Sequence, residues 1–112
     1  MKRIIAIVRP EKLEPLKKAL FEADVSGMTI GQVMGCGNQH GWKEFFRGGE
    51  VILNMVPKVK FEIIIEDERV DECIDVVIGA ARTGEVGDGK IFVSDVESVV
   101  RIRTGERDGD AI

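Results

Sequence analysis

The residues best suited to chemistry form a glycine-rich stretch, Thr83–Lys90, which leads into the apolar run Ile91–Val93. Glycines at 84, 87 and 89 free the backbone to turn tightly and to approach a ligand closely. Backbone N–H groups in such a loop, with the point charge of Lys90 beside them, suit a phosphate group. The plain alternative is a glycine turn that only joins a helix to a strand.

The same stretch comes close to a Walker A motif. Gly84, Gly89 and Lys90 have the right spacing, but Ile91 follows where the motif needs a Ser or Thr to hold magnesium. A Walker loop also opens a helix, whereas residues 91–96 have the pattern of a strand. A P-loop NTPase is therefore excluded.

Other groups suited to anions are spread along the chain. They are the Gly35–Gly37 turn, Lys58, and Arg101 with Arg103, which would share one face of a strand. Together with the glycine loop they suggest a polyphosphate ligand. His40 has no partner at motif spacing, and no positioned nucleophile or acid–base pair of the kind enzymes need is evident.

Length and charge narrow the class of protein. A chain of 112 residues predicts one domain, and a net charge of −4 argues against nucleic acid as a partner. Two cysteines make no disulfide framework and fit a reducing cytoplasm, while one histidine argues against structural zinc. The sequence has no apolar run near the roughly 20 residues of a membrane span, and its N-terminus does not resemble a signal peptide.

The hydrophobic pattern predicts the order strand, helix, strand, strand, helix, strand. Pro10 ends the first strand, and Pro15 places the start of the first helix near residues 12–14. Asp67 is expected to cap the second helix, with Cys73 in its buried stripe. The strands are expected at 3–8, 28–37, 59–66 and 90–96, and the second helix at 70–81.

This order predicts an α+β, ferredoxin-like βαββαβ split sandwich, with helices on one face of an antiparallel sheet. The other face still carries Ile, Val and Phe, which predicts a homo-oligomer. A long connection at 38–57, between strands 2 and 3, is rich in apolar residues. It is either a hairpin tip that packs locally or, as we favour, a loop that buries these residues in a partner.

The whole chain resembles the PII signal-transduction proteins. The resemblance rests on Thr83-x-x-x-Gly87-Asp88-Gly89-Lys90-Ile91-Phe92-Val93, on the ending Val100–Arg107, and on Arg9-Pro10, Pro57-Lys58 and Ala81–Gly84. It implies a cytoplasmic sensor of nitrogen and energy status, not an enzyme, that forms a homotrimer. The single domain 1–112 would have a flexible T-loop at about 37–55 and a C-terminal tail at about 98–112.

The resemblance also implies the ligands, which are ATP or ADP, Mg²⁺ and 2-oxoglutarate, bound between subunits. Gln39 would ligate Mg²⁺, and Gln39, Lys58 and Gly87 would hold 2-oxoglutarate. The implied nucleotide residues are Thr29, Gly35, Cys36, Gly37, Asn38, Glu62, Ile64, Gly87, Asp88, Gly89, Lys90, and a neighbour's Arg101 and Arg103. Among these, Cys36 and Asn38 depart from the family's usual residues.

The resemblance further implies that the T-loop contacts partner proteins. Trp42, Phe45, Phe46 and Arg47 are expected to contact target proteins, such as an ammonium transporter, glutamine synthetase or nitrogenase. Membrane contact would come only through a transporter. Val51 stands where many members carry a modified tyrosine, and residues 38–57 contain no Ser, Thr or Tyr, so no covalent modification is expected there. The alternatives are a PII-like paralogue with another target and, from a different class, a small ATP-hydrolysing enzyme.

Overall fold

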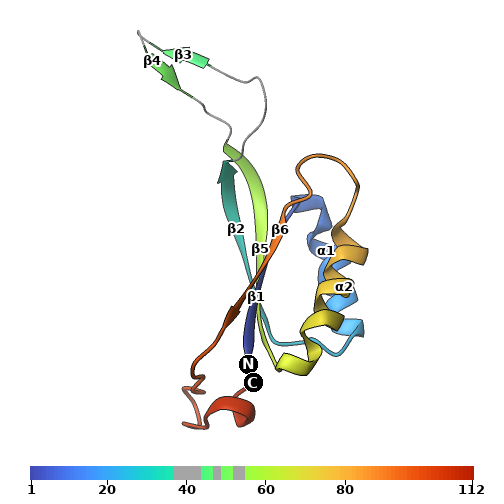
Figure 1. Ribbon diagram of the computed structural model, residues 1–112, viewed down its shortest axis with the longest axis vertical. Helices are drawn as coiled ribbons and strands as arrows, with labels where there is room; N and C mark the ends of the chain where they lie inside the picture. Colours follow the sequence, from blue (N-terminus) through green and yellow to red (C-terminus); the bar gives the residue numbers. More distant parts are fainter. Residues whose placement is uncertain (37–43, 47–48, 52–54) are drawn as a thin grey trace.

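A four-stranded antiparallel sheet forms the centre of the protein, seen in a computed structural model (Figure 1). The structure describes residues 1–36, 44–46, 49–51 and 55–112, with only the backbone for 44–46 and 49–51. The sheet has the order β2-β5-β1-β6. Its strands are β1 (Lys2–Val8), β2 (Met28–Cys36), β5 (Met55–Ile65) and β6 (Lys90–Asp95). The short strands β3 (Glu44–Phe46) and β4 (Gly49–Val51) pair separately.

Two helices, α1 (Leu13–Glu22) and α2 (Val70–Ala81), cover one face of the sheet (Figure 1). Alternate side chains of the central strands point toward these helices and are buried there, as the two-residue period of a strand requires. The core is built from Ile4, Ala6, Val8, Leu16, Leu20, Val25, Val59, Phe61, Ile63, Ile65, Cys73, Val77 and Ala81. The βαββαβ order and the ferredoxin-like fold are therefore confirmed.

The helix predictions are confirmed in their main points. The first helix begins at Leu13, so Pro15 lies in its first turn, where a missing N–H costs no hydrogen bond. Cys73 is 1% exposed and belongs to the core, and this burial raises the pKa of its thiol. Within the described ranges, no helix has the length and apolar character needed to cross a membrane.

The opposite face of the sheet keeps apolar side chains at its surface. Ile5, Ile7 and Ile64 are half-buried there, and Phe92 is 53% exposed. Phe92 lies opposite Ile5 in the register of β6 and β1, so both side chains point to this face. We call these four residues the open face.

Two local predictions are wrong. Asp67 does not cap α2, because a 3₁₀ turn over Asp67–Arg69 precedes the helix and its carboxylate instead accepts from the N-terminal amine at 2.7 Å. Arg101 and Arg103 do not lie on a strand. Arg101 precedes a turn at 102–104 that contains Arg103, and hydrogen bonds from Arg101 N to Glu106 O and from Gly105 N to Arg101 O close this turn.

The third strand of the main sheet begins earlier than expected. β5 starts at Met55, so Pro57 lies inside a strand and not in the connection before it. Pro57 pairs with Met34 of β2, beyond the last pair of β5 with β1, which is Val59 with Val8. One side of β5 has no neighbouring strand at this point, and a proline is tolerated on such an edge.

Candidate functional site

Asp88 organises the loop that joins α2 to β6. Its Oδ2 accepts hydrogen bonds from the backbone N–H groups of Thr83 and Gly84, each at 2.8 Å. The Thr83 hydroxyl donates to Oδ1 of the same carboxylate and accepts from Glu85 N at 3.1 Å. A short polar side chain that binds several nearby N–H groups fixes a turn in this way. The carboxylate thus holds the loop closed on itself.

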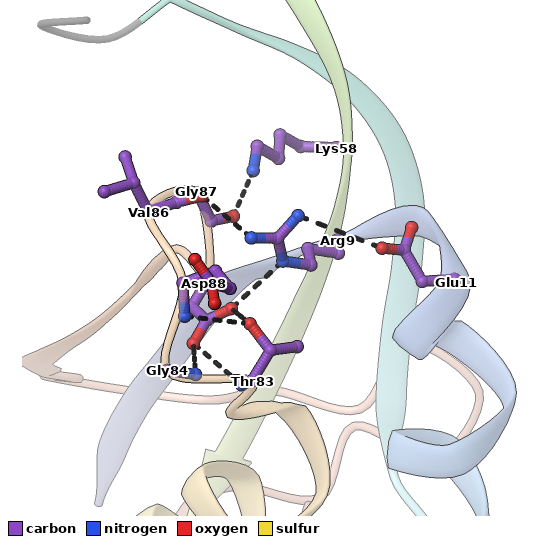
Figure 2. A network of polar contacts seen from close by, with 9 residues as sticks. Arg9, Glu11, Lys58, Thr83, Gly84, Val86, Gly87 and Asp88 are labelled. Atoms are coloured by element: carbon purple, nitrogen blue, oxygen red, sulfur yellow. Dashed lines mark hydrogen bonds and ion pairs between the residues drawn. The ribbon is translucent and has the colours of Figure 1, made fainter.

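Arg9 ties this loop to the end of β1 (Figure 2). Its Nε lies 3.0 Å from Asp88 Oδ1, and its Nη2 donates to the Val86 carbonyl at 2.8 Å. The hydroxyl and N–H of Thr83, with further hydrogen bonds from Arg9 and Gly84, hold the pKa of Asp88 well below its ordinary value. Asp88 is therefore ionised at neutral pH, and a fixed cation balances its charge.

Lys58 reaches the same loop from β5. Its Nζ donates to the Gly87 carbonyl, and Figure 2 shows Lys58 and Arg9 both pointing at this turn. A Cβ added at Gly87 would lie 3.3 Å from Arg9 Nη2, and one added at Gly35 of β2 would lie 3.1 Å from Lys58 Cγ. The structure thus brings together Gly35, Lys58 and Gly87, three predicted site residues that are far apart in the sequence.

Gly89 lets the loop lie directly against β1. Its φ is +99°, and a Cβ there would lie 1.7 Å from the carbonyl oxygen of Ile7, which is a severe clash. Gly87 has a φ of +105°, also in the region that favours glycine. A glycine at 89 is thus required by backbone contact with the sheet, and a glycine at 87 is favoured by its positive φ.

The predicted adenine residues lie in a second part of the site. Thr29 of β2 is directly opposite Glu62 of β5, and both line a hollow of about 690 Å³ together with Ile64. Glu62 also forms an ion pair with Arg3 at 3.4 Å. The hollow receives Arg101 from the C-terminal segment of the same chain, where Arg101 pairs with Glu106 at 3.0 Å.

The two parts are neighbours along the sheet. Glu62 pairs with Ile5 of β1, and Lys90, at the end of the glycine loop, pairs with Ile7 two residues further on. Ile5 and Ile7 are therefore separated by about 7 Å along β1. Directly opposed residues share a face, so Glu62 and Lys90 both point away from the helices, toward the open face.

Several predicted residues fall outside this description. Gly37, Asn38, Gln39, Trp42 and Arg47 lie outside the described residues, and the side chains of Phe45, Phe46 and Val51 do too. Cys36 is exposed at the end of β2, and its side chain points to the face opposite that of Gly35. Arg103 is exposed in the C-terminal turn.

Sequence reasoning gave Arg9 no role, although it holds both Asp88 and Val86 in place. One signal was present in the chain. Arg9 directly follows an apolar central strand, and a charged residue at the end of such a strand lies where loops meet. Nothing in the spacing of Arg9 and Asp88 along the sequence indicates that they touch.

Fold and loop together define a class. The chain is a small ferredoxin-like α+β protein whose glycine loop is shaped by an aspartate and two cations and leads into a strand. Residues 1–106 match the family model described as "Nitrogen regulatory protein P-II". The chain is 50% identical to "Nitrogen regulatory protein P-II" of Pasteurella multocida (strain Pm70) over 112 residues, the full length of both. It is 51% identical over the same full length to "Nitrogen regulatory protein P-II 1" of Escherichia coli (strain K12).

The chain belongs to the nitrogen regulatory protein P-II family. The family name describes a regulatory protein, and a regulatory protein acts on target proteins.

Proposed function

We propose that this protein signals nitrogen and energy status by binding ATP or ADP and, together with Mg-ATP, 2-oxoglutarate. The bound ligands would set the state of the T-loop, about 37–55, and so regulate an ammonium transporter or nitrogen-assimilation enzymes. The observation that carries this proposal is the convergence of Lys58 and Arg9 on the turn at Gly87, next to the side-chain-free Gly35.

The loop has the features that a polyphosphate needs. A chain of net charge −4 attracts a triphosphate only where several donors converge, and charge-assisted hydrogen bonds contribute about 1.5–3 kcal/mol each. Lys58 and Lys90 supply charge, while Gly35, Gly87 and Gly89 leave the backbone bare. Asp88 does not oppose an anion, because its carboxylate is turned to the loop N–H groups and to Arg9.

The adjoining hollow suits the nucleoside. Ile64 offers an apolar wall for a purine ring, and Thr29 and Glu62 offer polar groups for its edge. With its adenine in this hollow and its phosphates at Lys90, the nucleotide would lie along the open face, from Glu62 opposite Ile5 to Lys90 opposite Ile7 of β1. Arg101 and Arg103 of a neighbouring subunit would complete the phosphate site.

Lys58 would link 2-oxoglutarate to the nucleotide. The Lys58 ammonium donates to the Gly87 carbonyl of the glycine loop. A carboxylate of 2-oxoglutarate would compete with that carbonyl for the same ammonium, so the keto acid and the loop would both depend on Lys58. Gln39, with the ATP phosphates, would hold Mg²⁺, whose positive charge would offset the negative charge of the γ-phosphate and of the keto acid. ADP lacks that phosphate, so 2-oxoglutarate favours ATP, and each ligand must raise the affinity of the other by the same factor.

A homotrimer would cover the open face. Ile5, Ile7, Ile64 and Phe92 form an apolar surface that the chain itself leaves accessible. Light scattering of the wild type should give three times the chain mass, and Phe92→Asp should lower it. A monomeric wild type at micromolar concentration would contradict the trimer.

Signalling would be by ligand binding alone, in the cytoplasm, without catalysis. Residues 38–57 hold no Ser, Thr or Tyr, so the hydroxyl group needed for nucleotidylation or phosphorylation is missing from the T-loop. Intact-mass spectrometry of protein from nitrogen-starved and nitrogen-replete cells tests this. An added nucleotidyl or phosphoryl mass that maps to 38–57 would contradict it.

Calorimetry tests the ligands directly. ATP is titrated into the protein with Mg²⁺, first without and then with saturating 2-oxoglutarate. We expect three sites per trimer and a higher ATP affinity with the keto acid, but no such gain for ADP. Absence of ATP binding would overturn the proposed function, and ATP turnover well above background would favour the enzymatic alternative.

A further inference from the structure

Three sulfur-bearing residues lie where β2 and β5 lead into the long connection. Cys36 lies directly opposite Met55 in the strand register, and Met34 precedes Cys36 by two residues on the same strand. Opposed and next-but-one residues point to the same face of a sheet. Met34, Cys36 and Met55 therefore share one face, which is opposite the face that carries Gly35 and Lys58. We call them the sulfur cluster.

The sulfur cluster is accessible to solvent. Met34 is 55% exposed, Met55 is 59% exposed, and the Cys36 thiol is exposed and free. None of the three belongs to the hydrophobic core, whereas Met28, further along β2, packs against it. Core packing therefore does not account for the sulfur atoms at these positions.

The spacing allows the three sulfur atoms to meet. Cβ atoms directly opposite one another lie about 4.5–5.5 Å apart, and a residue two positions along a strand is displaced by roughly 7 Å. Methionine has three rotatable bonds and an unbranched thioether, so Met34 and Met55 can both turn toward Cys36. One thiol and two thioethers can thus surround a single ion.

We propose that the sulfur cluster binds one soft monovalent cation, Cu(I). Thiolate and thioether sulfur select Cu(I) over harder ions. The part of the chain that the structure describes contains no group of three His, Cys, Asp or Glu side chains placed to hold a metal ion. The site would join β2 to β5 at the root of the connection. This inference does not depend on nucleotide binding.

The binding step changes no oxidation state. As the copper–sulfur bond forms, the Cys36 thiol gives its proton to solvent, and the two thioethers each donate a lone pair. Copper enters and remains as Cu(I), so neither an oxidant nor a reductant is consumed.

The test is an anaerobic titration of the full-length protein with Cu(I), in competition with the chromogenic chelator bathocuproine disulfonate. We expect one Cu(I) per chain and a near-ultraviolet thiolate–copper absorption. Met34→Leu and Met55→Leu should each weaken binding by about tenfold, and Cys36→Ser should abolish the absorption. Met28→Leu, which keeps the cluster intact, is the matched control and should bind as the wild type does.

Circular dichroism should show that each variant is folded, because the cluster substitutions lie at exposed positions. Equal affinity in the Met34→Leu/Met55→Leu double variant would overturn the site, because binding would then need only the thiol. So would one copper per two chains, which indicates a bridge between Cys36 residues of different subunits, or absorption retained in Cys36→Ser.

Discussion

Arg9 and Asp88 join the end of β1 to a loop that follows 79 residues later, with Arg9 Nε 3.0 Å from Asp88 Oδ1. Both side chains are only about a quarter exposed, at 23% and 24%. Asp88 also binds the N–H groups of Thr83 and Gly84, while Arg9 binds the Val86 carbonyl. The pair therefore sets both the shape of the loop and its position on the sheet.

The first prediction concerns this pair. Arg9→Ala should weaken ATP binding by about tenfold or more, because the loop loses two charge-assisted hydrogen bonds that hold its backbone in position. Arg9→Lys should recover little, since an ammonium cannot reach both Asp88 and Val86 as the planar guanidinium does. Calorimetry measures both affinities. Glu11→Gln, which loses only an ion pair at 4.0 Å, is the control and should bind normally.

The second prediction is a pH dependence. The native pKa of Asp88 lies below its ordinary value of 3.8, so the ionised form stabilises the folded state. This contribution is fully present above the unfolded pKa and is lost as pH falls through the native pKa. Wild type should therefore lose its stability advantage over Asp88→Asn below about pH 4. Urea denaturation from neutral to acid pH measures the difference.

Asp75→Asn, at an exposed position on α2, is the matched control for that titration. Asp67 should behave like Asp88, because its hydrogen bond with the N-terminal amine also lowers its pKa. A gap between wild type and Asp88→Asn that stays constant through the acid range would show that the Asp88 carboxylate does not stabilise the fold by its charge.

The third prediction separates two glycines of the same loop. Gly89→Ala should destabilise the protein by about 4 kcal/mol or prevent folding, because the new Cβ meets the Ile7 carbonyl oxygen and cannot move away. Gly84 also has a positive φ, of +89°, but an added Cβ there meets open space. Gly84→Ala should therefore cost only about 1–2 kcal/mol. Equal melting temperatures for the two variants would contradict the close approach of the loop to β1.

Much of the fold follows from periodicity. The alternation in β5 and the helical spacing in α2 are local signals: α2 spans the predicted residues, while β5 covers the predicted strand as far as Ile65 but already begins at Met55. The wrong predictions concern residues whose structure depends on a segment that is distant in the sequence. Pro57 is tolerated in β5 because β1 ends before it reaches that position. The Asp67 carboxylate binds the N-terminal amine of Met1 and so does not cap the helix.

The site divides in the same way. Glycines are visible in a sequence, so Thr83–Lys90 stands out without any structure, and its three glycines do adopt a positive φ. The role of Arg9 depends on β1 and the loop being adjacent, which only the tertiary fold provides. The resemblance alone joins the residues predicted to bind adenine to those predicted to bind phosphate, and the register of β1 places Glu62 opposite Ile5 and Lys90 opposite Ile7, two residues further along.

The fourth prediction concerns the end of α1. Val25 N donates to Leu20 O at 2.8 Å and Asp24 N to Phe21 O at 3.1 Å, which is the Schellman pattern. Asp24 has a φ of +61°, where a side chain is strained. Asp24→Gly should therefore raise stability by about 0.5 kcal/mol, the strain relieved exceeding the entropy that glycine adds to the unfolded chain. Thermal denaturation checks this, with Ser26→Gly as a control at an exposed site nearby.

The fifth prediction concerns the coupling between effectors. Lys58→Met should leave ATP binding measurable but abolish the proposed gain in ATP affinity with 2-oxoglutarate, because the ammonium that would receive the keto acid carboxylate is gone. Lys60→Met removes a lysine two residues further along the same face of β5, opposite Gly31, and is the matched control. ATP is titrated with and without 2-oxoglutarate, and 2-oxoglutarate with and without ATP. Within each protein the two directions must give the same coupling factor, as linkage requires. Lys60→Met should keep the coupling factor of the wild type. Coupling that survives in Lys58→Met would place the keto acid elsewhere and leave Lys58 only its contact with the Gly87 carbonyl.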